Sequence, residues 1–430
     1  MKRQVLVYVE LNGVSHLAGK LWTRARGSRQ SATFEYAPEW LAHPDRFALE
    51  PALAIGSGPH HTPADAALFG ALSDSAPDRW GRVLMRRAER RLGAADRHSP
   101  RTLLEIDYLL GVHDVSRLGA LRFAEQEGGP FLAESTDANI PPFIALPKLL
   151  AAAEHVVGDA ESDEDLRLLL APGSSLGGAR PKASVLDTCG QLSTAKFPSP
   201  TDEWSAVRWE AVALSLARQA GIQVPQWTLE AVADKPVLLL KRFDRAPGTR
   251  IPFLSAMSML GARDRETRCY LEIVDALRRW GATPRKDMHA LFRRIVFNIL
   301  ISNTDDHLRN HGFLFPTSAG WQLAPAYDLN PVPLDVKPRV LATEIDFGDA
   351  TASLELAFRV AEYFELSQDE AQAVAGEVGA VISSWRAVAE KADIGAREIA
   401  RMASAFEHAD LAMTTGNAGR RRPRRSGPTA

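Results

Sequence analysis

An apolar helix followed at once by a polar loop is the feature that most restricts the fold of this chain. Residues 291–302 read LFRRIVFNILIS, and residues 303–312 read NTDDHLRNHG. An apolar run of this kind predicts a helix buried in a core, which would give the loop behind it rigid support. Three interpretations of this loop are open: an active-site loop, a metal site or a polar helix end. Motifs elsewhere in the chain distinguish between them.

The composition excludes several classes of protein. The chain has 430 residues, enough for two or three domains, and a net charge of −2, so the whole molecule is not an electrostatic nucleic-acid binder. The two cysteines, Cys189 and Cys269, exclude a disulfide framework and fit a reducing cytoplasm. No apolar stretch is long enough to span a membrane, and the N-terminus reads as a strand rather than a signal peptide.

The first third of the chain reads as strands with one basic helix. Residues 4–11 predict a strand, and Asn12-Gly13 predicts a hairpin turn after it. Residues 74–92 predict a helix whose basic face is either solvated surface or a contact for a partner or a phosphate. Residues 124–142 are acidic and rich in glycine and proline, which indicates a domain boundary.

The remainder changes from strands to helices. A glycine-rich turn lies between two strand-like runs in 173–200, and 206–222 predicts an amphipathic helix ending at Gly221. A buried strand runs through 235–245, and residues 255–415 are mostly helical. A strand-rich lobe before a helical lobe predicts an α+β, protein-kinase-like two-lobe fold with an additional N-terminal α+β subdomain. The predicted parts are 1–130 (N-terminal subdomain), 131–250 (N-lobe), 251–415 (helical C-lobe) and 416–430 (disordered arginine-rich tail).

The polar loop has the spacing of a phosphoryl-transfer site. Kinases use D-x-x-x-x-N, in which the aspartate orients the attacking hydroxyl and the asparagine binds magnesium. Asp305 and Asn310 have this spacing, whereas Asp306 is one position too close. Asp328, in PAYDLNP, supplies a second hard oxygen ligand of the kind that magnesium prefers.

Two further motifs would hold the phosphates. Lys196 ends a predicted strand, and Glu210 on the following helix would fix it by an ion pair, as in kinases. The stretch SSLGGARPK, 174–182, can bring backbone amides close to phosphate. Each motif alone has an ordinary structural explanation, and His307 most simply forms structural hydrogen bonds. Their order along the chain favours kinase-type phosphoryl transfer.

These motifs resemble the HipA-type serine/threonine kinases, the toxins of bacterial toxin–antitoxin pairs. The resemblance covers nearly the whole chain. It is carried by FEYAPEWL, SDSAPDRWGR, SLGGARPK, AKFP, KRFDR, NTDDHLRN and PAYDLNP in the family's order.

The resemblance assigns roles to the site residues. It implies that Asp305 is the catalytic aspartate, that Asn310 and Asp328 bind Mg²⁺, and that Lys196, paired with Glu210, contacts the phosphates of ATP. The strand ending in LLLKRFDR would be the hinge that holds adenine. The other residues expected at the nucleotide are Ser175, Gly177, Gly178, Ala179, Arg180, Lys241, Phe243, Asp244 and His307.

The family also implies regulation by autophosphorylation. The modified serine matches Ser175, with Ser174 as the alternative, and phosphate there would add about −1.5 to −2 charges to a loop meant to hold ATP. Two positions depart from the family pattern: Lys241 stands where an acidic residue is familiar, and Asp306 where glycine is.

The expected function is therefore an ATP- and Mg²⁺-dependent protein kinase acting as a cytoplasmic toxin. The resemblance implies a HipB-like DNA-binding antitoxin as partner, with DNA reached only through that complex, and an aminoacyl-tRNA synthetase or another translation-related protein as substrate. The alternatives are a small-molecule phosphotransferase and a catalytically idle corepressor. The arginine tail and the basic face of 79–91 motivate the second alternative.

Overall fold

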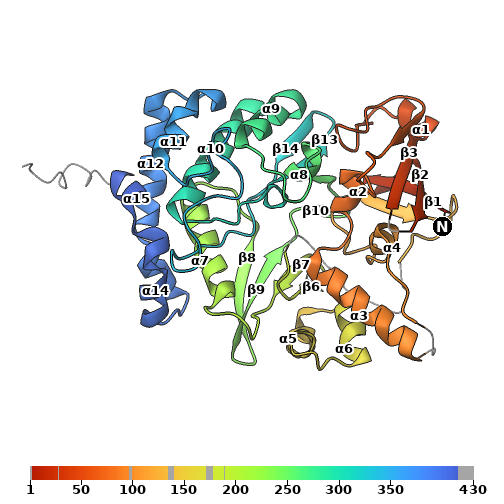
Figure 1. Cartoon of the computed structure of the whole chain (residues 1–430), viewed down its shortest axis with the longest axis horizontal. Helices are drawn as coiled ribbons and strands as arrows, with labels where there is room; N and C mark the ends of the chain where they lie inside the picture. Colours follow the sequence, from red (N-terminus) through yellow and green to blue (C-terminus); the bar gives the residue numbers. More distant parts are fainter. Residues whose placement is uncertain are drawn as a thin grey trace, which may run out of the picture.

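The computed structural model describes residues 2–27, 29–95, 99–133, 140–170, 178–187 and 189–414. Within these ranges, no helix combines the length and the apolar character needed to cross a membrane. One sheet lies at one end of the molecule, a second sheet lies lower in the centre, and the helices of the C-terminal half lie at the other end (Figure 1).

The N-terminal part is an antiparallel sheet with the strand order β4-β3-β2-β1-β5. Asn12 and Gly13 form the predicted turn, both with positive φ. The inner face of the sheet packs against three short helices through residues such as Trp40 and Leu72. The elements are β1 (Lys2–Leu11), β2 (Val14–Arg26), β3 (Arg29–Tyr36), α1 (Pro38–Ala42), β4 (Pro59–His61), α2 (Gly70–Asp74), α4 (Glu105–Leu110) and β5 (Leu121–Ala124).

The predicted basic helix is α3 (Arg79–Ala95), and three of its six arginines, Arg82, Arg87 and Arg91, form ion pairs within the protein. Arg87 bonds Asp159 and Glu161, both at 2.6 Å, on the connection between α5 (Leu146–Val157) and α6 (Asp163–Leu170). The 3₁₀ helix η1 (Phe143–Ala145) precedes α5. The basic face therefore docks α3 onto the second part of the chain, which neither interpretation of the sequence foresaw.

The second sheet is antiparallel with the order β6-β7-β9-β8. Helix α7 (Ala206–Gln219) covers one face, and α5 and α6 cover the other. Gly221, just beyond α7, has φ +76°, the left-handed conformation expected of its cap. The strands are β6 (Lys182–Leu186), β7 (Leu192–Lys196), β8 (Trp227–Val232) and β9 (Lys235–Lys241).

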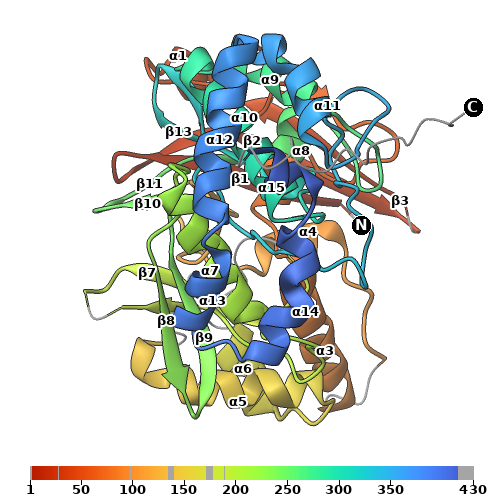
Figure 2. The same cartoon turned by 90° about the vertical axis from the view of Figure 1, so that its left-hand side faces the viewer.

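The C-terminal half is mostly helical, as predicted, and α10 runs through its core (Figures 1 and 2). A capping box formed by Ser367 and Glu370 begins α12. The helices are α8 (Ala256–Met259), α9 (Tyr270–Trp280), α10 (Pro284–Leu300), η2 (Leu308–Asn310), α11 (Leu354–Arg359), η3 (Ala361–Phe364), α12 (Gln368–Ile382), α13 (Trp385–Lys391), α14 (Ala396–Phe406) and α15 (Ala409–Thr414). The strands are β10 (Arg245–Ala246), β11 (Thr249–Arg250), β12 (Phe253–Ser255), β13 (Gly312–Thr317) and β14 (Gly320–Leu323).

The first sheet ends with β5 at Ala124, where the acidic, glycine-rich stretch begins. The division into four parts stays a prediction, and the tail 416–430 lies outside the described residues.

Candidate active site

The polar loop follows a buried helix, as the sequence predicts. Helix α10 is buried over most of its second half and ends at Leu300. Asn303 then bonds back to Asn298 at 3.1 Å, which fixes the start of the loop on the helix. The carboxylate of Asp305 is exposed, while its neighbours in the loop are buried. The fold thus presents one acid of the loop to solvent on a rigid base.

Asp306 has the opposite environment and a structural role. Its carboxylate is buried, accepts a short hydrogen bond from the Tyr270 hydroxyl, and accepts the backbone N–H of Ala342 at 2.7 Å. The backbone oxygen of Asp306 accepts the Thr343 hydroxyl at 2.8 Å. Burial raises the pKa of Asp306 to about 7, although these donors act in the other direction. Asp306 therefore ties the loop to residues 342–343, which gives its carboxylate a structural role.

Asn310 is oriented in the way a metal ligand needs. Its side-chain N–H donates to the backbone oxygen of Asp305 at 2.8 Å. This bond occupies the amide N–H side of Asn310, and the amide oxygen is left buried with no hydrogen-bond partner in the described structure. A buried polar atom normally has a partner. The orphaned oxygen is therefore the observation that fits a metal ion at this position.

The structure brings Lys196, Glu210 and Asp328 together. The ammonium of Lys196 bonds both carboxylate oxygens of Glu210, at 2.6 and 2.8 Å, and Oδ1 of Asp328 at 3.0 Å. Burial opposes the charge on Lys196, but the Asp328 and Glu210 carboxylates outweigh it and raise its pKa. Burial likewise opposes the charge on Asp328, but Lys196 and Lys182 hold its pKa at about 2. Lys196 and Asp328 are therefore poised in their charged forms, whereas burial raises the pKa of Glu210 against the opposing charge of Lys196.

Asp328 lies in a constrained turn beside the polar loop. Its φ is +58°, a left-handed conformation that aspartate tolerates better than most residues. The preceding residue, Tyr327, donates its hydroxyl to the backbone oxygen of Arg309 at 2.7 Å. The backbone N–H of Asn330 donates to the Asn303 side chain at 3.3 Å. These bonds hold the turn of Asp328 and the loop of Asp305 and Asn310 in fixed register.

His307 is half-buried at the start of η2. Its Nδ1 atom is buried and has no partner in the described structure, and its ring is close enough to contribute to the lowered pKa of Asp328. His311 is instead buried in the core, and this burial lowers its pKa to about 3. His307 therefore lies within electrostatic reach of the site, and its predicted contact with a nucleotide stays a prediction.

Only the end of the predicted glycine-rich loop can be placed. Ser174, Ser175 and Gly177 lie outside the described residues. Gly178 has φ +91°, and a Cβ atom there would lie 4.0 Å from Oδ2 of Asp328, so this end of the loop approaches the site closely. Ala179 and Arg180 are exposed, and Arg180 forms an ion pair with Asp202.

The expected hinge residues separate into two groups. Lys241 ends β9 half-buried, and Phe243 stacks on Tyr327 with ring centroids 5.4 Å apart, one residue from Asp328. Asp244 is fully buried and bonds Arg242, Arg245 and the backbone N–H of Gly119. Phe243 is thus brought to the site, whereas the Asp244 carboxylate is occupied by Arg242, Arg245 and the backbone N–H of Gly119.

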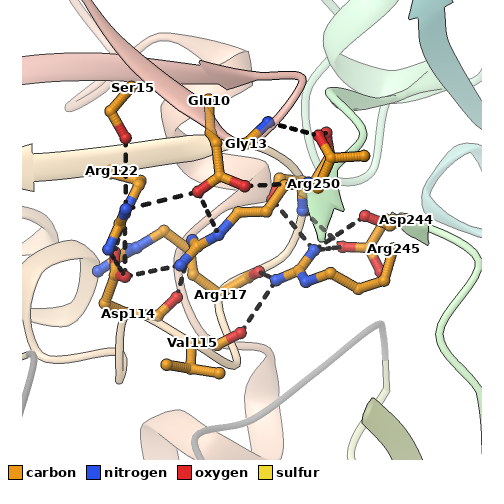
Figure 3. Close-up of polar contacts among 12 residues, drawn as sticks. Glu10, Gly13, Ser15, Asp114, Val115, Arg117, Arg122, Asp244, Arg245 and Arg250 are labelled. Carbon is orange, nitrogen blue, oxygen red and sulfur yellow. Dashed lines mark hydrogen bonds and ion pairs between the residues drawn. The ribbon is translucent and has the colours of Figure 1, made fainter. Parts of the chain in front are cut away.

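Asp244 belongs to a buried charge network that joins the N-terminal sheet to the hinge (Figure 3). Arg245 donates to the backbone oxygens of Val115 and Arg117. Arg250 bonds Oδ2 of Asp114 at 2.6 Å, and its backbone N–H donates to Glu10 at 3.1 Å. The segment 242–250 is therefore built against β1 and residues 114–119 of the N-terminal part.

Sequence reasoning did not foresee the ion pair between Lys182 of the glycine-rich stretch and Asp78. Lys182 is buried at the start of β6, and its ammonium bonds Oδ2 of Asp78 at 2.7 Å. It also helps lower the pKa of Asp328. Both residues lie in motifs that were recognised, GARPK and SAPDRW, but only the fold brings the two motifs together. The N-terminal part therefore contributes to the electrostatics of the site.

The donor set fits magnesium bound with a nucleotide. Among the described residues, no group of three or more His, Cys, Asp and Glu side chains could hold a metal ion. Magnesium commonly takes one or two protein oxygens and completes its shell with water and phosphate. The Asn310 amide oxygen and the Asp328 carboxylate supply two such oxygens.

Comparison with known proteins matches two parts of the chain to family models. A model of the HipA-like C-terminal domain matches residues 174–385, and a model of the HipA N-terminal domain matches residues 8–106. HipA from Shewanella oneidensis MR-1, solved in a toxin–antitoxin complex with HipB and operator DNA, superposes with a TM-score of 0.68 at 14% identity. That match covers 96% of this chain and 99% of the other, and it confirms the predicted α+β, kinase-like fold.

Two curated relatives match over shorter stretches. The "Putative kinase" of Haemophilus influenzae is 25% identical over 219 residues, which is 44% of this chain and 64% of that protein. The "Putative kinase Y4dM" of Sinorhizobium fredii is 29% identical over 187 residues, which is 40% of this chain and 42% of that protein. The chain thus matches less than two thirds of the length of either relative.

Proposed function

Because the chain belongs to the HipA family, we propose that it is an ATP- and Mg²⁺-dependent serine/threonine protein kinase. The contact of Lys196 with both Glu210 and Asp328 carries the proposal. Glu210 lies 14 residues from Lys196 and Asp328 lies 132 residues away, so chance proximity along the chain does not explain the arrangement. It is the lysine–glutamate pair of a kinase, placed against a metal-binding aspartate.

Different residues of the chain would perform different steps of phosphoryl transfer. Asp305 is exposed and would accept the proton of the acceptor hydroxyl while orienting it for attack. Asn310 and Asp328 would hold Mg²⁺, which neutralises phosphate charge when bound. Lys196, fixed by Glu210, would position the transferred phosphate. The hydrogen bond from Asn310 to the Asp305 backbone links the metal ligand to the base.

The proposed biological role is that of a toxin controlled by an antitoxin. The S. oneidensis protein of the same fold was solved with HipB and operator DNA, which supports a HipB-like partner for this chain. The proposed substrate is a translation-related protein such as an aminoacyl-tRNA synthetase, and the proposed inactivating autophosphorylation site is Ser175, with Ser174 as the alternative.

Transfer of labelled phosphate from ATP tests the catalytic part. The wild-type chain with Mg²⁺ should incorporate phosphate, and Asp305→Asn should lower the rate by about 10²–10⁴ because the general base is lost. Asp369→Asn, which changes an exposed carboxylate at the start of α12, is the matched control and should keep the wild-type rate. Equal rates for the wild type and Asp305→Asn would refute the assignment.

The acceptor is identified by a phosphosite map of protein expressed without its antitoxin. Phosphate on Ser175 or Ser174 supports a protein kinase that modifies itself. ATP turnover that starts only when a small metabolite is added would instead support a small-molecule phosphotransferase.

A further inference from the structure

The solvent-facing side of the N-terminal sheet carries a cluster of basic residues. Directly paired residues on neighbouring strands share a face of the sheet, and residues two apart on a strand do so as well. The strand pairing puts Lys2 opposite Arg24 and Arg26 opposite Arg29, and Lys20 lies on the same side of β2. All five side chains are exposed. They are called here the cationic face, and it lies at the end of the molecule away from α11, α12 and α14 (Figure 1).

This arrangement is unfavourable for the sheet itself. Like charges directly opposite each other on neighbouring strands destabilise a sheet, whereas opposite charges stabilise it by roughly 0.2–1 kcal/mol. The cationic face has two such like-charge pairs, Lys2 with Arg24 and Arg26 with Arg29. Features that break a local rule of stability are expected where function requires them. The two pairs therefore indicate that an anion outside the chain compensates them.

Carboxylates of the sheet do not provide this compensation. On the described strands β1 to β4 the pairing places two carboxylates on this side of the sheet: Glu35, opposite Lys20, and Glu10, which is paired with Arg122 and Arg250. No ion pair joins Lys2, Arg24, Arg26 or Arg29 to another residue in the described part of the chain. Because Arg122 and Arg250 neutralise Glu10, the five cations and Glu35 give the face a charge of +4, although the whole chain carries −2. The positive field is therefore local to this face.

We propose that the cationic face binds the phosphate backbone of duplex DNA without reading its sequence. From Lys20 to Arg26 the face extends over about 20 Å along β2, a length on which a duplex presents about twelve phosphate charges. A single strand is held instead by exposed aromatic rings on which bases stack. The aromatic ring at the centre of this face, Trp22, is half-buried and has its indole N–H bonded to Gln4 at 2.8 Å. The face thus offers cations rather than a stacking platform.

This contact differs from the expectation that DNA is reached only through an antitoxin. The chain itself would touch the backbone, so the contact does not depend on the proposed kinase activity. The tail 416–430 carries five arginines and is the competing source of such binding within the same chain.

Fluorescence anisotropy of the full chain with a labelled duplex of arbitrary sequence tests the proposal. The test variant is Arg24→Glu combined with Arg29→Glu, which replaces both like-charge pairs by opposite-charge pairs and so should not lower the melting temperature. The control variant is Arg279→Glu combined with Arg397→Glu, two exposed arginines on α9 and α14 with the same change in net charge. A third protein ends at Thr414 and lacks the tail.

The wild type should bind with an affinity that falls steeply between about 50 and 200 mM salt, with a slope of about −0.9 for each phosphate contacted. The test variant should lose about eightfold in affinity at about 0.1 M salt for each contact removed, and its slope should be shallower by about two. The control variant and the tail-less protein should bind nearly as well as the wild type. The proposal is overturned if the test and control variants bind equally, if removing the tail abolishes binding, or if the wild type shows no salt-dependent binding.

Discussion

Asp244 allows a quantitative test of the network that joins the hinge to the N-terminal sheet. Its carboxylate is fully buried and accepts hydrogen bonds from Arg242 at 2.5 and 2.6 Å, from Arg245 at 2.6 Å and from the backbone N–H of Gly119 at 2.8 Å. Asp244→Asn keeps the shape of the side chain but removes its charge. Two arginines would then face a neutral amide in the protein interior.

The expected loss of stability follows from the charges left without a partner. Removing one member of a buried ion pair costs about 3–5 kcal/mol. The pKa of Asp244 gives an independent and smaller value for this loss of stability. Burial alone would raise that pKa, but Arg242 and Arg245 outweigh burial and lower it from 3.8 to about 2. At 1.36 kcal/mol per unit, this shift corresponds to about 2 kcal/mol of stability at neutral pH.

The pH dependence has a defined sign. Because the pKa of Asp244 is lower in the folded state, its contribution is present above the unfolded value of 3.8 and is lost as the pH falls toward about 2. Urea unfolding should therefore show a constant difference between wild type and Asp244→Asn above about pH 5, shrinking at lower pH. Asp264→Asn is the control, since Asp264 forms an exposed pair with Arg309 and its loss should cost under about 1 kcal/mol. A loss at Asp244 no larger than at Asp264, or a difference that does not shrink in acid, would refute the reasoning.

Three further predictions concern the candidate active site. Glu210→Gln should raise the KM for ATP and lower kcat by about 10²-fold, measured by steady-state phosphorylation, because Lys196 loses the carboxylate that positions it. Asn310→Ala should raise the Mg²⁺ concentration needed for half-maximal activity, measured by Mg²⁺ titration, because an oxygen ligand is removed; an unchanged requirement would exclude Asn310 as a ligand. Asp306 has its pKa raised by burial from 3.8 to about 7, so its contribution to stability is present below pH 3.8 and is lost as the pH rises through about 7. Asp306→Asn should lack that loss in urea unfolding followed from pH 4 to 8, and the same pH profile in variant and wild type would contradict it.

Local spacing was sufficient wherever the chemistry lies within one loop or one turn. Five positions separate Asp305 from Asn310, and the structure joins them by a hydrogen bond within that loop. The Asn12-Gly13 turn and the capping box at Ser367 were predictable for the same reason, since each depends on contacts between residues a few positions apart. The sequence also predicted the pairing of Lys196 with Glu210, because a strand and the helix that follows it pack together.

Contacts between residues far apart in the sequence could not be predicted from local spacing. Asp306 looked like a second charge beside the base, and only the packing of Tyr270 and residues 342–343 around the loop shows that it is buried and structural. Asp244 was expected at the nucleotide because it follows Phe243. The structure bonds its carboxylate to Arg242, Arg245 and the backbone N–H of Gly119, 125 residues away, and its contact with a nucleotide stays a prediction.

The sequence by itself determined the chemistry of this protein: which acids, amides and cations are present, in what order, and at what spacing within each motif. The tertiary structure alone decided which of them meet. Lys182 reaches Asp78 across 104 residues, and Lys196 reaches Asp328 across 132. Side-chain charge and short-range backbone geometry are local properties of a sequence. Burial is not local, because it depends on the packing of segments from distant parts of the chain, and burial determines whether a carboxylate serves as a base, a metal ligand or a structural support.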